Sequence, residues 1–185
     1  MQADLTALWR PARAMNERDL AEIYTAFSPR LFRYAYRFLG DAAESEEAVA
    51  ETFHRFLAAL RRNQGPQQHL SGYLYRILHN IITDRFRRQP PPDLPLTDDL
   101  PGDGDLAQVQ AVHSEQARAR ALLQHLTPEQ RFVVSCKFLE GLSNDEIAAA
   151  LGKNVGTVKA LQHRGLEALR RALTREGWSS EGAQT

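Results

Sequence analysis

The amino-acid sequence predicts an all-α protein: two small helical domains joined by a flexible, acidic, proline-rich linker. Apolar residues recur at helical spacing through most of the 185 residues, and signals for strands are nearly absent. Helix caps and helix-ending glycines separate these segments. Residues 89–105 hold five prolines, five aspartates and two glycines, a composition that cannot bury a core. We therefore place an N-terminal domain at 1–88, the linker at 89–105 and a C-terminal domain at 106–185.

The N-terminal domain is predicted to contain four helices. Asn16 can cap the first, and Pro29 restarts a second, because proline is tolerated in the first turn of a helix. Asp41 can cap a third helix, whose apolar residues form a stripe with a 3.6-residue period. Ser71 begins the fourth, which ends in the basic run at 85–88, where cations suit the negative end of the helix dipole.

The C-terminal domain is predicted to contain a helix-turn-helix at 142–159, after helices at 106–125 and 127–139. Ser143 can cap the first helix of this motif, and Glu146, three residues later, completes a capping box. Gly152 suits the turn, because glycine adopts positive φ at little cost. In a helix-turn-helix the second helix enters the major groove of DNA.

The charges of the chain alternate in blocks. Lys plus Arg and Asp plus Glu both total 23, so net charge alone indicates no nucleic-acid partner. Residues 41–51 nevertheless contain five acids and no Lys or Arg, whereas residues 53–89 contain seven arginines and one acid. Residues 153–175 contain six cations and one acid. Such blocks indicate several surfaces with different partners.

Several classes of protein are disfavoured by the composition. Cys136 is the only cysteine, so an internal disulfide is impossible, and the six histidines show no metal-ligand spacing with it. No glycine loop for phosphate appears, and we predict no catalytic residue, metal or cofactor. No apolar run approaches the roughly 18 residues of a membrane span, and the N-terminus lacks a secretory core. We therefore expect a cytoplasmic protein without membrane insertion.

Three segments together resemble a bacterial RNA polymerase sigma factor of the extracytoplasmic-function (ECF) group in the sigma-70 family. Residues 41–53 are similar to its region 2.2, residues 72–88 to regions 2.3 and 2.4, and residues 126–173 to region 4. One helix-turn-helix alone is a weak signal, whereas three segments in family order are a strong one. The resemblance implies an alternative sigma factor, not an enzyme, that directs core polymerase to specific promoters and assists melting of the −10 element.

Region 2.2 implies a surface for the clamp helices of the polymerase β′ subunit. The residues assigned to it are Asp41, Glu44, Glu47, Glu51, Thr52 and Phe53. The alternative is a solvated face whose acids suit a helix N-terminus. Residues 132–139 are similar to the segment near the β flap, although the same residues are needed for core packing.

Regions 2.3 and 2.4 imply capture of single-stranded DNA at the −10 element, which needs aromatic faces for stacking and cations for phosphates. The candidates are Tyr73, Tyr75, Arg76, Asn80, Arg85, Arg87 and Arg88. Positions 73, 76, 80 and 87 can share one helical face, and the Asn80 amide can both donate to and accept from a flipped base. Either tyrosine can equally be a core residue, and the arginines can simply cap the helix.

Region 4 implies recognition of the −35 element as a duplex. The candidates are Lys153, Thr157, Lys159, Ala160, Gln162, His163 and Arg164. They face outward if Val158, Leu161, Leu166 and Leu169 face inward, and Lys or Arg can then pair with guanine and Gln with adenine. A solvated basic face is the alternative. Family members usually have other residues at 160 and 162, so their promoter preference does not transfer.

The resemblance also implies partners: core RNA polymerase, promoter DNA and an anti-sigma factor that covers regions 2 and 4. Two other functions stay open at this point. One is a helix-turn-helix regulator with an N-terminal signal domain, which would bind duplex DNA tightly by itself. The other is an all-helical adaptor protein whose basic face is incidental.

Overall fold

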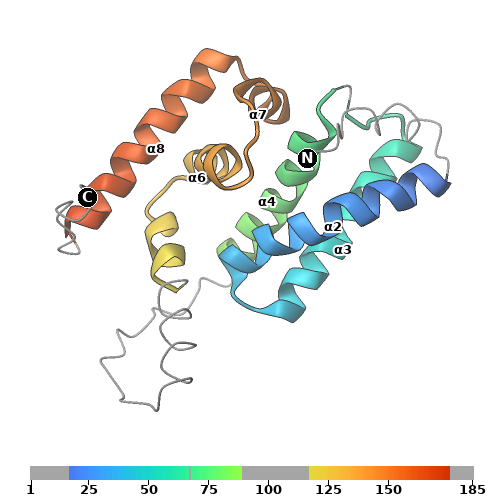
Figure 1. Cartoon of the computed structure of the whole chain (residues 1–185), viewed down its shortest axis with the longest axis horizontal. Helices are drawn as coiled ribbons and strands as arrows, with labels where there is room; N and C mark the ends of the chain where they lie inside the picture. Colours follow the sequence, from blue (N-terminus) through green and yellow to red (C-terminus); the bar gives the residue numbers. More distant parts are fainter. Residues whose placement is uncertain (1–16, 67, 89–116, 176–185) are drawn as a thin grey trace, which may run out of the picture.

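The computed structural model describes residues 17–66, 68–88 and 117–175, and every regular element in these ranges is helical. The predicted all-α class is therefore confirmed for the described part of the chain. The helices form two units that lie side by side (Figure 1). The predicted linker at 89–105 and the predicted cap at Asn16 lie outside the described residues.

Three helices build the N-terminal unit: α2 (Glu17–Leu39), α3 (Ala42–Arg61) and α4 (Leu70–Arg88). Asp41 caps α3 as predicted, because its carboxylate accepts a 2.8 Å hydrogen bond from the backbone N–H of Glu44. The predicted apolar stripe of α3 is buried against the other two helices, with Phe56 and Leu60 among its members.

The predicted helix break at Pro29 is wrong, because α2 continues through it. Proline in a helix interior costs about 3 kcal/mol. Phe27 and Leu31, on either side of it, are both fully buried, and the same apolar stripe continues to Phe38. Burying one such side chain contributes about 1.5–3 kcal/mol, so packing of the continuous stripe outweighs the local penalty.

The C-terminal unit follows residues 117–124, which are helical. Its further elements are α6 (Pro128–Val134), the π-helix η1 (Ser135–Leu139), α7 (Asn144–Leu151) and α8 (Val155–Arg175). Both predicted capping boxes are present, at Thr127 and at Ser143. Gly152 ends α7 in the left-handed conformation at φ 62°, so α7 and α8 form the predicted helix-turn-helix.

The helix before the helix-turn-helix ends in a π-helical turn, which is wider than the α-helical turn that the sequence predicts. In η1 the backbone N–H of Glu140 bonds the carbonyl of Ser135, five residues earlier, at 3.2 Å. Such π-turns are rare and carry no clear sequence signal. Next to Cys136, which is buried, this turn leaves Phe138 and Leu139 about half exposed, at 51% and 46%.

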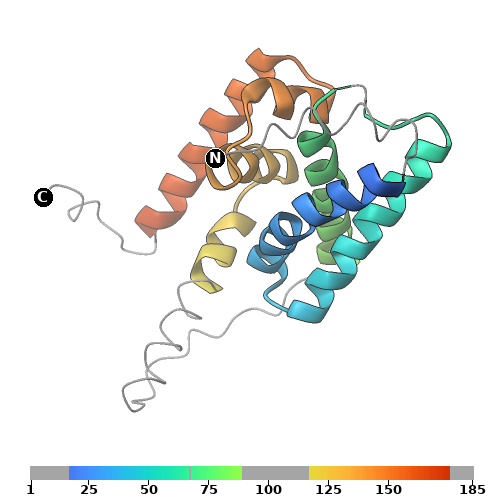
Figure 2. The ribbon, with the colours of Figure 1, turned by 45° about the vertical axis from the view of Figure 1, so that its right-hand side comes forward.

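The two units pack against each other along α4, which lies beside α6 and α7 (Figures 1 and 2). We call the contact between α4 and the group α6, η1 and α7 the seam. Buried side chains of both units form one continuous cluster across it. At Gly72 an added Cβ would lie 2.6 Å from the backbone carbonyl oxygen of Glu146, so α4 and α7 approach closely because that position is glycine.

Candidate nucleic-acid interfaces

The recognition helix α8 presents a cationic outer face. Lys159, His163 and Arg164 are exposed, whereas Val158 and Leu161 are buried beneath them. Lys159 and His163 are four residues apart and lie on one side of the helix, and Arg164 is the next residue after His163 on the exposed surface. Such a face can enter a DNA major groove and place cations against base edges.

The inner face of α8 differs from prediction at Leu166, which is 42% exposed. Gly165 takes the inner position instead, and a Cβ there would lie 2.8 Å from Cγ2 of Val134 in α6. The buried positions 158, 161, 165 and 172 are three, four and seven residues apart and form one stripe, and residue 166 falls beside it. Because α8 crosses α6 closely at Gly165, Gly165 is buried and Leu166 is exposed beside it.

The other predicted region 4 residues surround the start of α8. Asn154 caps the helix, because its Oδ1 accepts a 2.8 Å bond from the backbone N–H of Thr157. Lys153 is exposed and makes a 3.2 Å ion pair with Glu129. Ala160 is exposed and Gln162 is half-buried. All seven candidates thus lie on or next to the exposed side of the helix-turn-helix, and their DNA contacts stay a prediction.

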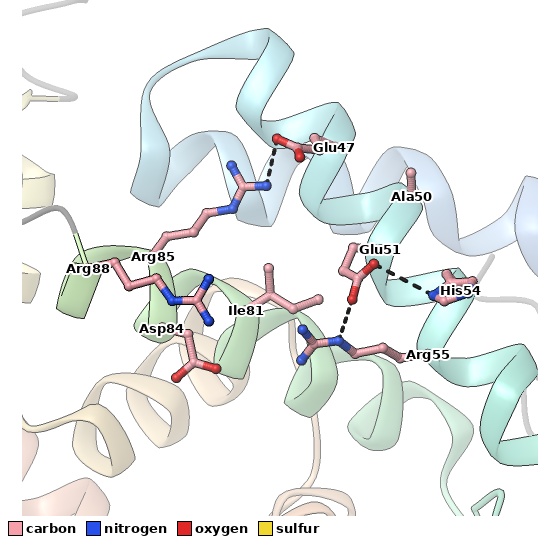
Figure 3. A pocket seen from close by; sticks show the side chains of 9 residues that line it. All are labelled: Glu47, Ala50, Glu51, His54, Arg55, Ile81, Asp84, Arg85 and Arg88. Atoms are coloured by element: carbon pink, nitrogen blue, oxygen red, sulfur yellow. Dashed lines mark hydrogen bonds and ion pairs between the residues drawn. The ribbon is translucent and has the colours of Figure 1, made fainter.

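Helix α3, which carries the acidic block, lies on the side of the N-terminal unit away from α8 (Figures 1 and 2). Asp41, Glu44 and Glu47 are exposed there. Between α3 and α4 the surface is hollowed by about 450 Å³, and this hollow is lined by acids and arginines together: Glu47, Glu51, Asp84, Arg55, Arg85 and Arg88 (Figure 3). A partner that meets this face therefore encounters both signs of charge.

Arginines of the same unit pair with the α3 acids. Arg85 of α4 lies 2.8 Å from Glu47, and Arg55 donates a 2.7 Å hydrogen bond to Glu51 (Figure 3). That hydrogen bond lowers the pKa of the Glu51 carboxyl. Because these pairs are largely exposed, a competing partner can exchange them at little cost.

Two residues assigned to the polymerase-binding surface lie in the core. Thr52 is fully buried and its hydroxyl donates to the carbonyl of Ala48 at 2.7 Å. Phe53 is 8% exposed and its ring lies 4.7 Å from that of Tyr24. The assignment of these two side chains to a surface is therefore wrong for this structure, because the apolar stripe of α3 includes them.

The residues predicted to contact the −10 element are divided between two faces of α4. Tyr73 is half-buried against Phe56, and Asn80 is exposed. Arg76 instead faces α6, with its guanidinium carbon 5.6 Å from the centre of the Phe132 ring. The predicted common face of positions 73, 76, 80 and 87 spans about 60° of the helix surface. Within it the Arg76 side chain turns toward α6, whereas Asn80 stays exposed.

Tyr75 lies in the seam rather than on a surface. Its side chain is fully buried, and its hydroxyl donates a 2.6 Å hydrogen bond to Glu140. Burial, followed by this hydrogen bond, raises the pKa of the phenol, so it stays a donor at every pH of interest. In this arrangement Tyr75 is a core residue and cannot reach DNA.

The three arginines at the end of α4 remain close to solvent. Arg85 pairs with Glu47, Arg87 pairs with Asp84, and Arg88 is exposed beside the hollow of Figure 3. Together they give this end of the helix a cationic surface suited to phosphates.

His79 is a seam residue that the sequence did not single out. Its Nε2 donates a 2.9 Å hydrogen bond to the carbonyl of Pro128, so Nδ1 of the neutral ring accepts from the Tyr34 hydroxyl, also at 2.9 Å. Burial lowers its pKa from 6.5 to about 3, and the nearby guanidinium groups of Arg131 and Arg76 act in the same direction. The packed structure therefore requires a neutral imidazole.

We expect the stability of the protein to fall as the pH drops below the ordinary pKa of histidine. His79 is neutral when packed but protonates when exposed, so its contribution is complete above pH 6.5 and is lost toward pH 3. Between about pH 7.5 and 5.5 the free energy of unfolding should fall by about 1.4 kcal/mol from this residue. Urea unfolding at several pH values measures this change.

The matched variants are His79→Gln and His54→Gln, since the side chain of His54 is 79% exposed. The first should flatten the pH dependence and the second should retain it. An unchanged slope in His79→Gln would contradict the assignment.

Among the described residues, no three His, Cys, Asp or Glu side chains gather closely enough to hold a metal ion. None of the helices in these ranges combines the length and apolar character needed to cross a membrane.

Comparison with protein families assigns both units. Residues 23–90 match the family model described as Sigma-70 region 2, and residues 116–169 match the model described as Sigma-70, region 4. The two matches cover the N-terminal and C-terminal units in that order.

Curated relatives are similar over most of the chain. The ECF RNA polymerase sigma factor SigE of Mycolicibacterium smegmatis is 34% identical, with 89% of this chain and 64% of the relative covered. SigW of Bacillus subtilis, also described as an ECF RNA polymerase sigma factor, is 30% identical, with 85% and 90% covered. The chain thus spans just under two thirds of SigE and nearly all of SigW.

Solved structures share the fold. CnrH, in complex with the cytosolic domain of CnrY, has a TM-score of 0.69 at 23% identity, with 92% of this chain and 97% of that chain covered. The sigma factor RpoE of Bartonella quintana, in complex with the anti-sigma factor NepR, has a TM-score of 0.56 at 20% identity, with 85% and 98% covered.

Proposed function

Because the chain belongs to the sigma-70 family of RNA polymerase sigma factors, in the extracytoplasmic-function group, we propose that it is an alternative sigma factor. It binds core RNA polymerase, directs it to specific promoters and assists melting of the −10 element, while the polymerase performs the chemistry. The observation that carries this proposal is the match of regions 2 and 4, in family order, to the two helical units.

Each surface of the molecule has a part in this function. The cationic face of α8 reads the −35 element as duplex, with Lys159 and Arg164 as its main cations. The exposed acids of α3 bind the β′ clamp helices, and the half-exposed Phe138 and Leu139 meet the β flap. Separate placement of the α3 and α8 surfaces supports simultaneous binding of polymerase and promoter.

Two further elements of the proposal concern regulation and location. An anti-sigma factor holds this protein inactive, by analogy with RpoE of Bartonella quintana, whose solved structure contains the anti-sigma factor NepR. The protein acts in the cytoplasm, where promoter DNA and polymerase are found.

Transcription from a promoter library tests the function. The full-length chain is mixed with core polymerase from its own cell, and RNA made from templates with randomised −35 and −10 elements is sequenced. We expect co-elution with the polymerase and RNA that starts downstream of shared −35 and −10 motifs. Co-elution without promoter selection would overturn the proposal, and tight duplex binding by the free chain as a dimer would favour a conventional regulator.

Asn80→Ala separates −10 capture from polymerase binding. Asn80 is exposed on α4 outside the seam, so its amide can reach a flipped base. Loss of its hydrogen bonds should slow open-complex formation about tenfold, the effect of roughly 1.4 kcal/mol, with unchanged affinity for core polymerase. Permanganate reactivity of the −10 thymines measures opening. Weakened polymerase binding in this variant would contradict the role of Asn80.

A further inference from the structure

The helix-turn-helix carries one cation that is already paired with an acid. Lys153 lies in the turn between α7 and α8, and its ammonium nitrogen is 3.2 Å from a carboxylate oxygen of Glu129 in α6. Lys159 and Arg164, on the outer face of α8, make no ion pair with any acid in the described part of the chain. Because Lys153 lies outside the recognition helix, it suits a phosphate, whereas side chains on that helix reach base edges.

The fold, rather than the ion pair, holds Glu129 beside this turn. Glu129 lies in the first turn of α6, where an acid suits the positive end of the helix dipole. Hydrogen bonds between Thr127 and Gln130, at 3.1 and 3.3 Å, close the capping box around it. Helix α6 in turn packs beside α8 (Figure 1), with a close approach at Gly165. Neutralising Glu129 should therefore change the charge at this place and leave the fold intact.

The ion pair between Lys153 and Glu129 matters more for DNA binding than for stability. Its side chains are 34% and 42% exposed, and ion pairs that are this open to water contribute little to folding. Each phosphate that a cation neutralises, by contrast, strengthens DNA binding and steepens its salt dependence. The paired Lys153 adds no net charge, and the Glu129 carboxylate repels a phosphate placed beside it. Since phosphate contacts strengthen binding to every sequence, the pair weakens the part of DNA binding that ignores sequence.

We propose that Glu129 restrains sequence-independent binding to DNA: it holds the Lys153 ammonium group away from the phosphates, so that duplex recognition depends on Lys159 and Arg164. Glu129 acts through Lys153 and is therefore a positioning residue. The consequence at the −35 element rests on the proposed function, whereas attraction to phosphates needs no promoter.

Salt titration of the polymerase complex tests this role. Affinity is measured for a promoter selected in the transcription experiment and for the same duplex with a substituted −35 element. Glu129→Gln should steepen the slope of log affinity against log salt concentration by about 0.9, because one more phosphate is contacted. The gain should be about eightfold at about 0.1 M salt and equal on both duplexes. A substitution that merely loosened the fold would lower the affinity, so the steeper slope identifies the released cation.

Glu22→Gln is the matched control, because it neutralises an acid that pairs with Arg18 at 3.4 Å on the exposed surface of the N-terminal unit. It should leave the slope unchanged. Adding Lys153→Ala to Glu129→Gln should cancel the gain, since the gain passes through the ammonium group. An unchanged slope in Glu129→Gln, an equal gain in Glu22→Gln, or a gain that persists without Lys153 would overturn the role of Glu129.

A second measurement needs neither polymerase nor promoter. The free full-length chain is titrated at low salt with a labelled duplex of random sequence, and Glu129→Gln should again raise the affinity and steepen the slope. If the polymerase complex selects no promoter, the sigma function fails, whereas this titration still decides the role of Glu129. Equal slopes for parent and variant on the random duplex would overturn that role even if promoters are selected.

Discussion

Replacing Phe132 with alanine should lower the free energy of unfolding by about 3–5 kcal/mol, the range for buried phenylalanines. The Phe132 side chain is fully buried at the seam, with its ring centre 5.2 Å from that of His79 and beneath the guanidinium of Arg76. The loss includes a cavity term, because helices from two units cannot both move inward to fill the space. Urea unfolding followed by circular dichroism measures the change.

Phe138→Ala is the matched control, since it removes the same side chain six residues later. Phe138 is 51% exposed in η1, so its loss should change stability by only about 0.5 kcal/mol. Equal effects of the two substitutions would contradict the packing described for the seam.

Local features of the fold could be predicted from the sequence because their causes are local. The cap at Asp41 and the boxes at Thr127 and Ser143 each depend on residues three positions apart. The turn at Gly152 depends only on the φ angle of that residue, which is positive. These short-range signals were sufficient to place the helix-turn-helix and the start of α3 without knowledge of what packs against them.

Packing decided the features that sequence patterns predicted wrongly. Thr52 satisfied both the apolar stripe of α3 and the family's polymerase-binding motif, and the stripe was the correct guide to where its side chain lies. Pro29 gave a local stop signal, but continuous burial on both sides outweighed it. In each case the energy of the surrounding core exceeds that of the local preference.

The seam could not be predicted, because its contacts join distant residues. Glu140 lies 103 residues from Arg37 and 65 from Tyr75, and a single acid after a helix end normally indicates a solvated position.

The alternating blocks of charge were equally ambiguous. The acidic block on α3 is partly neutralised by Arg85 of α4, so alternating blocks also indicated neighbours within one unit. The blocks therefore describe folding contacts as well as partner surfaces.

The double substitution Lys159→Ala and Arg164→Ala should reduce promoter affinity more than any other surface change. Both side chains are exposed on the outer face of α8, above the buried Val158 and Leu161, so their removal leaves the fold intact. A specific cationic contact to a base contributes about 1–3 kcal/mol. Together the two should cost roughly 30-fold to 20,000-fold in affinity.

Footprinting of the polymerase complex on a selected promoter, with and without a substituted −35 element, measures this loss. The variant should lose protection at the −35 element and should no longer distinguish the two templates. Arg61→Ala with Arg62→Ala is the control, because it removes the same charge from exposed positions in the N-terminal unit. An equal loss in that control would mean that general electrostatic attraction accounts for the effect, because base recognition depends on position whereas attraction depends on total charge.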